Sequence, residues 1–151
     1  GLLADKNHNK KSMTMKFRAS FCDPLEPDII ELTDISKDTI IGYFEKINWF
    51  YFLQKMTTAK QDDIYYSPSF EVENIESKSG IVITAVGTPN NFEFSIFYKR
   101  PKIVKQFFGL IEKVIENYST DIRSQTKNDA LDCIKALLRN DMGFLSSKVG
   151  Q

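Results

Sequence analysis

Two close pairs of carboxylates are the side chains of this sequence with the clearest capacity for chemistry. Asp62 and Asp63 are adjacent, and Glu71 and Glu73 stand two residues apart in a segment with strand character, which places both on one face. Either pair could exchange protons with a substrate or hold a divalent cation. The competing interpretation is a solvated acidic loop and a strand face in water. We favour it because a carboxylate pair needs burial to shift its pKa, and nothing in the sequence indicates burial.

Most other catalytic and cofactor chemistries lack the residues that they require. The single histidine, His8, lies in a polar N-terminal segment, which argues against Ser-His-Asp and Cys-His nucleophiles and against histidine-based metal sites. Cys22 and Cys133 stand far apart, and neither belongs to a CxxC pair. The seven glycines are scattered singly, without a phosphate-binding motif. We therefore predict no catalytic residues, no metal and no cofactor, and the balance leans away from an enzyme.

A basic cluster stands where a helix is predicted to begin. It consists of Lys99, Arg100, Lys102 and Lys105. Pro101 suits the first turn of a helix, and apolar residues then recur at three- and four-residue spacing as far as Tyr118. Free backbone N–H groups at a helix N-terminus, together with these cations, would bind phosphate or carboxylate. This is a weak candidate for anion binding, and the alternative is a strand end and helix start exposed to solvent.

The densest aromatic run, Trp49–Phe52, precedes a loop over residues 57–68 that contains the two aspartates. Consecutive apolar residues on a helix point in nearly all directions, so one or two of them should stay exposed unless all pack between sheet and helices. Exposed aromatic residues beside acidic ones are typical of protein-binding surfaces. The sequence thus predicts a surface for a basic protein partner, formed by Trp49, Phe50, Tyr51, Asp62, Asp63, Tyr65 and Tyr66.

Composition narrows the classes of partner and the compartment. The 151 residues carry 20 basic and 20 acidic side chains, so no net charge attracts nucleic acid. Residues 21–80 are nevertheless acidic, with five basic and twelve acidic side chains. No apolar run approaches the roughly 20 residues that span a bilayer, so we expect no membrane association. Two isolated cysteines favour reduced thiols in a soluble, cytoplasmic protein. Because the chain begins with Gly1, a removed export signal remains an alternative.

Hydrophobic periodicity predicts a sheet built mostly from sequential strands. The segments with strand character are 13–21, 28–33, 70–75, 80–86 and 92–99. Segment 80–86 is apolar on both faces and is expected to be the central strand, covered on both sides. A turn over Gly87–Asn91 joins it to the next strand, since Pro89 and the two asparagines favour turn conformations.

Capping residues predict where the helices begin. Ser36 is the expected N-cap of a helix through Ile47, which either continues to Met56 or gives way to a second helix at Asn48. Further helices are predicted over 101–118 and 126–138. We read residues 1–12 as a mobile polar tail and 13–151 as one α+β domain. Its antiparallel sheet has a three-strand meander plus one or two N-terminal strands, with helices packed chiefly on one face.

Two functional hypotheses follow. The first is a non-enzymatic protein-interaction domain of inhibitor, antitoxin-like or immunity type, which uses the acidic and aromatic surface. The second is a small-ligand pocket protein or enzyme with a site between sheet and helices, and with Tyr65, Tyr66 and the aspartate pair at its mouth. A flat acidic patch favours the first, and a concave cavity of roughly several hundred Å³ with convergent polar groups favours the second. The oligomeric state is left open.

Overall fold

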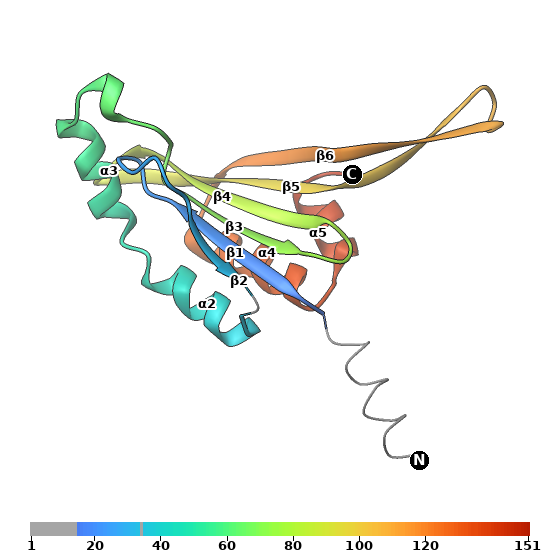
Figure 1. The fold of residues 1–151 in the computed structure, drawn as a ribbon, viewed down its shortest axis with the longest axis horizontal. Helices are drawn as coiled ribbons and strands as arrows, with labels where there is room; N and C mark the ends of the chain where they lie inside the picture. The colour runs from blue at the N-terminus through green and yellow to red at the C-terminus, as the bar shows by residue number, and fades with distance from the viewer. Residues whose placement is uncertain (1–14, 34) are drawn as a thin grey trace, which may run out of the picture.

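The computed structural model describes residues 15–33 and 35–151, and within them the chain forms one antiparallel sheet of six strands with four α-helices (Figure 1). The predicted tail 1–12, which includes His8, lies outside the described residues. The strands are β1 (Phe17–Cys22), β2 (Ile30–Thr33), β3 (Ser69–Asn74), β4 (Ser79–Thr88), β5 (Asn91–Gln106) and β6 (Ile111–Gln125). Their order across the sheet is β2-β1-β3-β4-β5-β6. The α+β class and the meander are therefore confirmed, and β6 lengthens the meander by one strand.

Alternating side chains bury one face of this sheet. Ala19, Val72, Ile81 and Tyr98 lie opposite one another across β1, β3, β4 and β5, and all four are buried. The opposite face, which we call the open face, carries polar and partly exposed side chains. The prediction that β4 is central is correct, but the prediction that both of its faces are covered is wrong. Val82 and its neighbours on the open face are partly exposed because the helices pack against the other face.

Four helices cover the buried face, and their caps are local in sequence. They are α2 (Lys37–Lys46), α3 (Trp49–Thr58), α4 (Lys127–Leu138) and α5 (Met142–Val149). The Ser36 side chain caps α2, and the Asn48 side-chain oxygen Oδ1 accepts a hydrogen bond from the Tyr51 N–H at 3.1 Å. Asn48 therefore starts a new helix. Thr126 and Asp129 form a reciprocal capping box at α4. None of these helices in the described chain is long and apolar enough to cross a membrane.

The core between the sheet and the helices is rich in aromatic rings. Trp49, at the first position of α3, is only 3% exposed. Its ring contacts Phe94 edge-on at 5.2 Å between centroids, Phe21 at 6.0 Å and Phe44 at 6.2 Å. Such edge-to-face pairs contribute about 0.5–1.5 kcal/mol beyond the burial of area. Trp49 thus joins α2 and α3 to the sheet.

The structure contradicts the helix predicted over residues 101–118. Strand β5 continues through Pro101 to Gln106, and β6 returns antiparallel to it, with Ile103 opposite Val114. Beyond Lys99, β5 pairs only with β6 in the described chain, so residues 101–118 form a two-stranded ribbon, the arm, which projects past the sheet (Figure 1). The helix prediction was wrong because the apolar residues that recur at three- and four-residue spacing lie on both faces of an exposed ribbon. Pro101 is tolerated because the pairing register shifts between Arg100 and Lys102.

Candidate functional site

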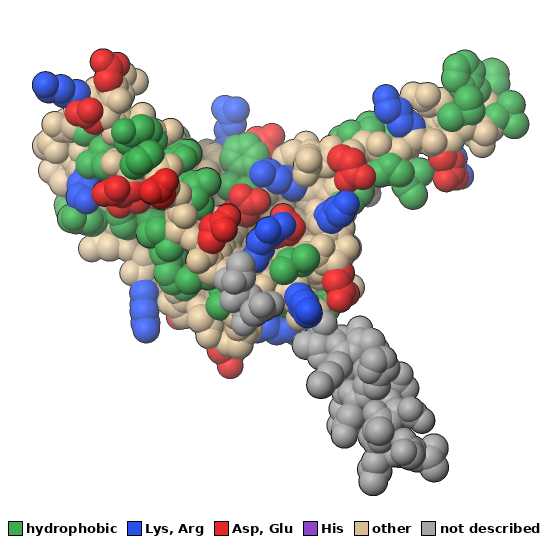
Figure 2. Space-filling view, viewed as in Figure 1, with side chains coloured by type: hydrophobic (Ala, Val, Ile, Leu, Met, Phe, Trp, Pro, Cys, Tyr) green, Lys and Arg blue, Asp and Glu red, His purple; other side chains and the backbone are tan. Residues whose placement is uncertain are grey.

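The tip of the arm presents large apolar side chains to solvent. Residues 107–110 form its turn, in which the Leu110 N–H donates to the Phe107 carbonyl at 3.1 Å. Phe107 is 67% exposed, Leu110 is 85% exposed and Phe108 is as exposed as an isolated residue, at 107%. Figure 2 shows the hydrophobic cluster at the far end of the projecting ribbon. The tip therefore contributes nothing to the hydrophobic core.

Backbone strain accompanies these exposed rings. Phe107 and Phe108 have φ angles of 53° and 57°, and Gly109 follows at 86°. Left-handed backbone in a non-glycine residue costs about 1 kcal/mol or more. Consecutive left-handed residues in a hairpin turn usually select Asn and Gly. Two phenylalanines at these positions are therefore unfavourable for the turn itself.

The two faces of the arm differ in charge. Cross-strand pairing puts Lys102 opposite Ile115 and Val104 opposite Lys113, so this face carries apolar and basic side chains. The other face carries Ile103, Val114, Lys105 and Glu112. Ile103, Ile111, Val114 and Ile115 are all exposed. The apolar surface of the tip thus continues down both faces of the ribbon.

Arg100 fixes the base of the arm to the body of the protein. Its guanidinium donates to the Tyr98 carbonyl at 2.8 Å, to the Thr120 hydroxyl at 2.6 Å and to the Gly150 carbonyl at 2.8 Å. The same group lies over the rings of Tyr98, at 4.1 Å, and Tyr118, at 4.7 Å. Arg100 therefore ties β5, β6 and the end of α5 together where the ribbon leaves the sheet.

The predicted anion site loses its structural basis. Lys99, Arg100, Lys102 and Lys105 lie on β5, so there is no helix N-terminus among them. Lys99 lies on the open face with its amine 3.8 Å from a Glu71 carboxylate oxygen. The Arg100 guanidinium donates hydrogen bonds within the protomer, including one to the Gly150 carbonyl. Lys105 is opposite Glu112 in the arm. The cluster is thus divided between the sheet, the base of the arm and the arm itself.

The predicted acidic and aromatic surface is divided by helix α3. Trp49 is buried, whereas Phe50 and Tyr51 in the first turn are each 47% exposed. Asp62 and Asp63 are exposed in a short 3-10 helix, Gln61–Asp63, beyond the end of α3. A helix of this length separates the two groups by about 15 Å. Beyond it, Tyr65 is exposed, while the Tyr66 hydroxyl donates to the Pro27 carbonyl at 2.8 Å.

The carboxylate pairs are not assembled into a buried site. On the open face, Glu73 accepts a hydrogen bond from Arg18 at 3.0 Å, and Glu71 pairs with Lys99. Within the described chain, no group of three or more His, Cys, Asp or Glu side chains is placed to hold a metal ion. Cys22 and Cys133 are both free thiols, and burial raises the pKa of Cys133 to about 11. The exposure of Asp62 and Asp63 and the ion pairs of Glu71 and Glu73 on the open face agree with the solvated interpretation of the two carboxylate pairs.

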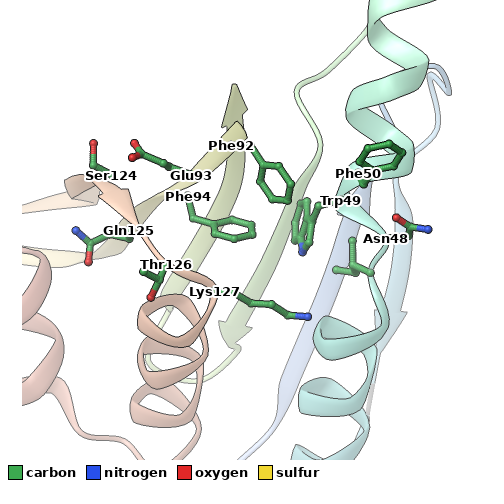
Figure 3. Close-up of a pocket in the computed structure, with 11 residues that line it drawn as sticks. Asn48, Trp49, Phe50, Phe92, Glu93, Phe94, Ser124, Gln125, Thr126 and Lys127 are labelled. Atoms are coloured by element: carbon green, nitrogen blue, oxygen red, sulfur yellow. The ribbon is translucent and has the colours of Figure 1, made fainter. Parts of the chain in front are cut away.

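Two concave sites flank the junction between α2 and α3, and sequence reasoning missed both. The first, the Trp49 pocket, has a volume of about 510 Å³ (Figure 3) and is lined by Ile47, Asn48, Trp49, Phe50, Phe92, Glu93, Phe94, Ser124, Gln125, Thr126 and Lys127. The second, the Tyr43 groove, has a volume of about 420 Å³ and is lined by Phe21, Ile30, Tyr43, Lys46, Ile47, Asn48, Tyr51 and Phe52. Each combines distant segments of the chain, so no local motif marks it.

The Trp49 pocket contains an unpaired donor. Trp49 Nε1 is buried and has no hydrogen-bond acceptor among the described residues. Nearby, the Lys127 amine donates to the Glu45 carbonyl at 3.2 Å, next to Phe44, whose ring packs on the indole. A buried donor without an acceptor costs about 1–3 kcal/mol. The wall of the pocket therefore contains an unsatisfied, buried indole N–H beside aromatic rings.

No family model, no curated protein and no solved structure matches this chain, so the interpretation of these sites is based on their geometry.

Proposed function

We propose that this protein is a non-enzymatic protein-interaction domain and that the arm is its main contact element. The observation that carries the proposal is the exposure of Phe107, Phe108 and Leu110 at the end of a ribbon held away from the body. Complete burial of a Leu or Phe side chain contributes about 1.5–3 kcal/mol. A partner with a recessed apolar site would gain this energy from each ring that it receives.

The backbone of the tip supports the same proposal. The turn would be more stable with Asn or Gly at the left-handed positions 107 and 108, and neither phenylalanine packs in the core. Strained residues retained at exposed positions are frequent at binding sites. We therefore assign the two rings to a contact outside the protomer, because they serve neither the turn nor the fold.

A protein partner suits the arm better than a lipid bilayer. The arm carries Lys102, Lys105 and Lys113 against Glu112 and Glu116, so its attraction to anionic lipid is weak. Strand β4 pairs with β5 only as far as Lys99. The β5 edge of the arm therefore has unpaired backbone N–H and C=O groups, whose hydrogen bonds a hydrocarbon environment could not satisfy. A partner strand could pair with such an edge.

The hydrogen bonds of Arg100 to Tyr98, Thr120 and Gly150, which we call the clamp, make the arm a preorganised contact element. A ribbon fixed at its base loses less conformational entropy on binding than a free loop does. The acidic residues Asp62 and Asp63 would then assist only a partner large enough to reach the far side of the body. This assigns the main binding energy to the arm and a steering role to the predicted acidic loop.

The test compares a tip variant with a matched surface variant in crosslinking capture of partner proteins. Phe107→Asn with Phe108→Gly removes both rings and supplies the residues that the turn prefers, so unfolding would not explain a loss of binding. Phe50→Asn removes an exposed aromatic ring elsewhere and should keep the captured proteins. Asp62→Lys with Asp63→Lys should slow association without abolishing it. Capture that survives the tip variant contradicts the proposal, as does tip-dependent cosedimentation with phosphatidylserine vesicles in the absence of any protein partner.

A second candidate function is the binding of a small ligand in the Trp49 pocket. The buried, unpaired Trp49 Nε1 favours it, since an aromatic carboxylate that displaced the side chains over the indole could accept from that N–H and lie near the Lys127 amine. Trp49 is the only tryptophan, so its indole N–H gives a single NMR resonance. Addition of 2-naphthoate should move that resonance downfield, and Lys127→Ala should weaken the effect. An unchanged resonance at millimolar 2-naphthoate would exclude this ligand class.

A further inference from the structure

We infer that the partner of the arm is a second copy of this chain, whose Tyr43 groove receives the tip. This inference rests on the proposed role of the arm and names its partner. It accounts for two features that the fold of one protomer leaves unexplained, namely the strained apolar tip and an open apolar groove.

The chemistry of the groove matches that of the tip. Aromatic and aliphatic side chains make up most of its lining, and Lys46 is its one charged lining residue. The tip presents apolar side chains at 107, 108 and 110, followed by the acidic Glu112. A volume of about 420 Å³ lies in the range of roughly 300–1,000 Å³ that holds drug-sized molecules, which are comparable in size to two phenyl rings.

Open strand edges lie beside both features. Ile30 borders the groove and belongs to β2, the edge strand on the side of the sheet opposite to the arm. In the described chain β2 pairs only with β1, and Ile29 and Ile30 are exposed. The arm has its own open edge on β5 beyond Lys99. Two unpaired edges with apolar side chains readily pair with each other. An arm seated in the groove would therefore lie close to a strand edge of the receiving copy.

The tip cannot reach the groove of its own protomer. Phe92 and Phe94, at the start of β5, pack beside Trp49, while Gln106, at the end of the same strand, leads into the tip. At about 3.4 Å per residue, the fourteen residue-to-residue steps from Phe92 to Gln106 span roughly 48 Å. Figure 1 accordingly shows the arm and helix α3 at opposite ends of the molecule. The contact must therefore be made between copies, either reciprocally in a closed dimer, in which each tip enters the groove of the other copy, or head-to-tail in a longer chain.

Charge does not oppose this assembly. The formal net charge is zero, so two copies approach one another without net repulsion. The alternative of two arms meeting tip to tip leaves the groove empty and would produce closed dimers. The two arrangements therefore differ in whether association needs the groove, and this difference can be measured.

The experiment is sedimentation velocity of the purified full chain over a concentration series, with three variants. Phe107→Asn with Phe108→Gly removes the tip, Ile30→Glu with Tyr51→Glu places charge in the groove at two exposed positions, and Phe50→Glu is the control on the same helix outside the groove. The wild type and Phe50→Glu should self-associate into dimers or larger assemblies. Each of the other two variants should stay monomeric, with association weakened at least tenfold.

Mixing the two monomeric variants provides the decisive result. The tip variant keeps an intact groove and the groove variant keeps an intact tip, so their mixture should form a one-to-one heterodimer that grows no further. A monomeric wild type at millimolar concentration, a groove variant that still dimerises, or a mixture without heterodimer would overturn the inference. If the wild type is monomeric but a different protein is captured in a tip-dependent manner, the proposed function stands and this inference falls. If neither occurs, both fall.

Discussion

Replacement of Arg100 by methionine should destabilise the protein more than replacement of any other basic residue on β5. The substitution removes three hydrogen bonds from a charged donor, each of which contributes about 1.5–3 kcal/mol in favourable cases. It also removes two stacking contacts with tyrosine rings, each of which contributes about 0.5–1 kcal/mol at partly exposed sites.

These contributions do not add in full. Arg100 is partly exposed, so water can replace the guanidinium at some of the acceptors, and the aliphatic part of methionine keeps some packing. We therefore expect a loss of about 2–4 kcal/mol in the free energy of unfolding, which is a large share of the stability of a small domain.

Urea denaturation of the wild type and three variants measures this loss. Arg100→Lys should lose most of the same free energy, because an ammonium group cannot reach three acceptors or stack between two rings as a planar guanidinium does. Lys105→Met, on the arm of the same strand, should change stability by less than about 0.5 kcal/mol because its side chain is exposed. A loss below about 1 kcal/mol for Arg100→Met, or an Arg100→Lys protein as stable as the wild type, would refute the clamp.

Three further predictions concern the body of the protein. Ile83→Ala should cost about 2–5 kcal/mol in the free energy of unfolding, since Ile83 is fully buried on the central strand, and a loss below about 1 kcal/mol would show that β4 is not central. In the folded protein at pH 8, iodoacetamide should leave Cys133 unmodified, because burial raises the pKa of this thiol to about 11, and rapid labelling followed by mass spectrometry would contradict its burial. Hydrogen bonds from the backbone N–H and hydroxyl of Thr126 lower the pKa of Asp129 in the folded protein. The capping box should therefore stabilise the fold fully above about pH 4, and this stabilisation should be lost as the pH falls through the folded-state pKa of Asp129. The difference in stability between the wild type and Asp129→Asn should accordingly shrink in acid, and a difference that stays constant down to pH 2 would exclude this linkage.

The sequence by itself determined the elements whose signals are local. Alternation identified the strands that bury one face, because neighbouring side chains on a strand point in opposite directions whatever the strand pairs with. Ser36 and Thr126 marked helix starts, since a capping side chain reaches only the N–H groups two or three residues ahead. At Asn48 the sequence left a continued helix and a new helix open, and the structure shows the new helix. The turn between β4 and β5 follows from Pro89 and its asparagine neighbours for the same reason.

The conformation of the arm, which carries the proposed function, was decided by tertiary structure. Residues 101–118 contain apolar side chains at spacings that fit a helix, and only the pairing of β6 with β5 makes them a ribbon. Periodicity is informative when one face is buried, and neither face of the arm is buried in the protomer. Trp49 offers the converse case, because its burial depends on contacts with Phe94 and Phe44 from other elements. The grooves beside it exist only where α2, α3 and the sheet meet, and such contacts between distant segments leave no local pattern in the sequence.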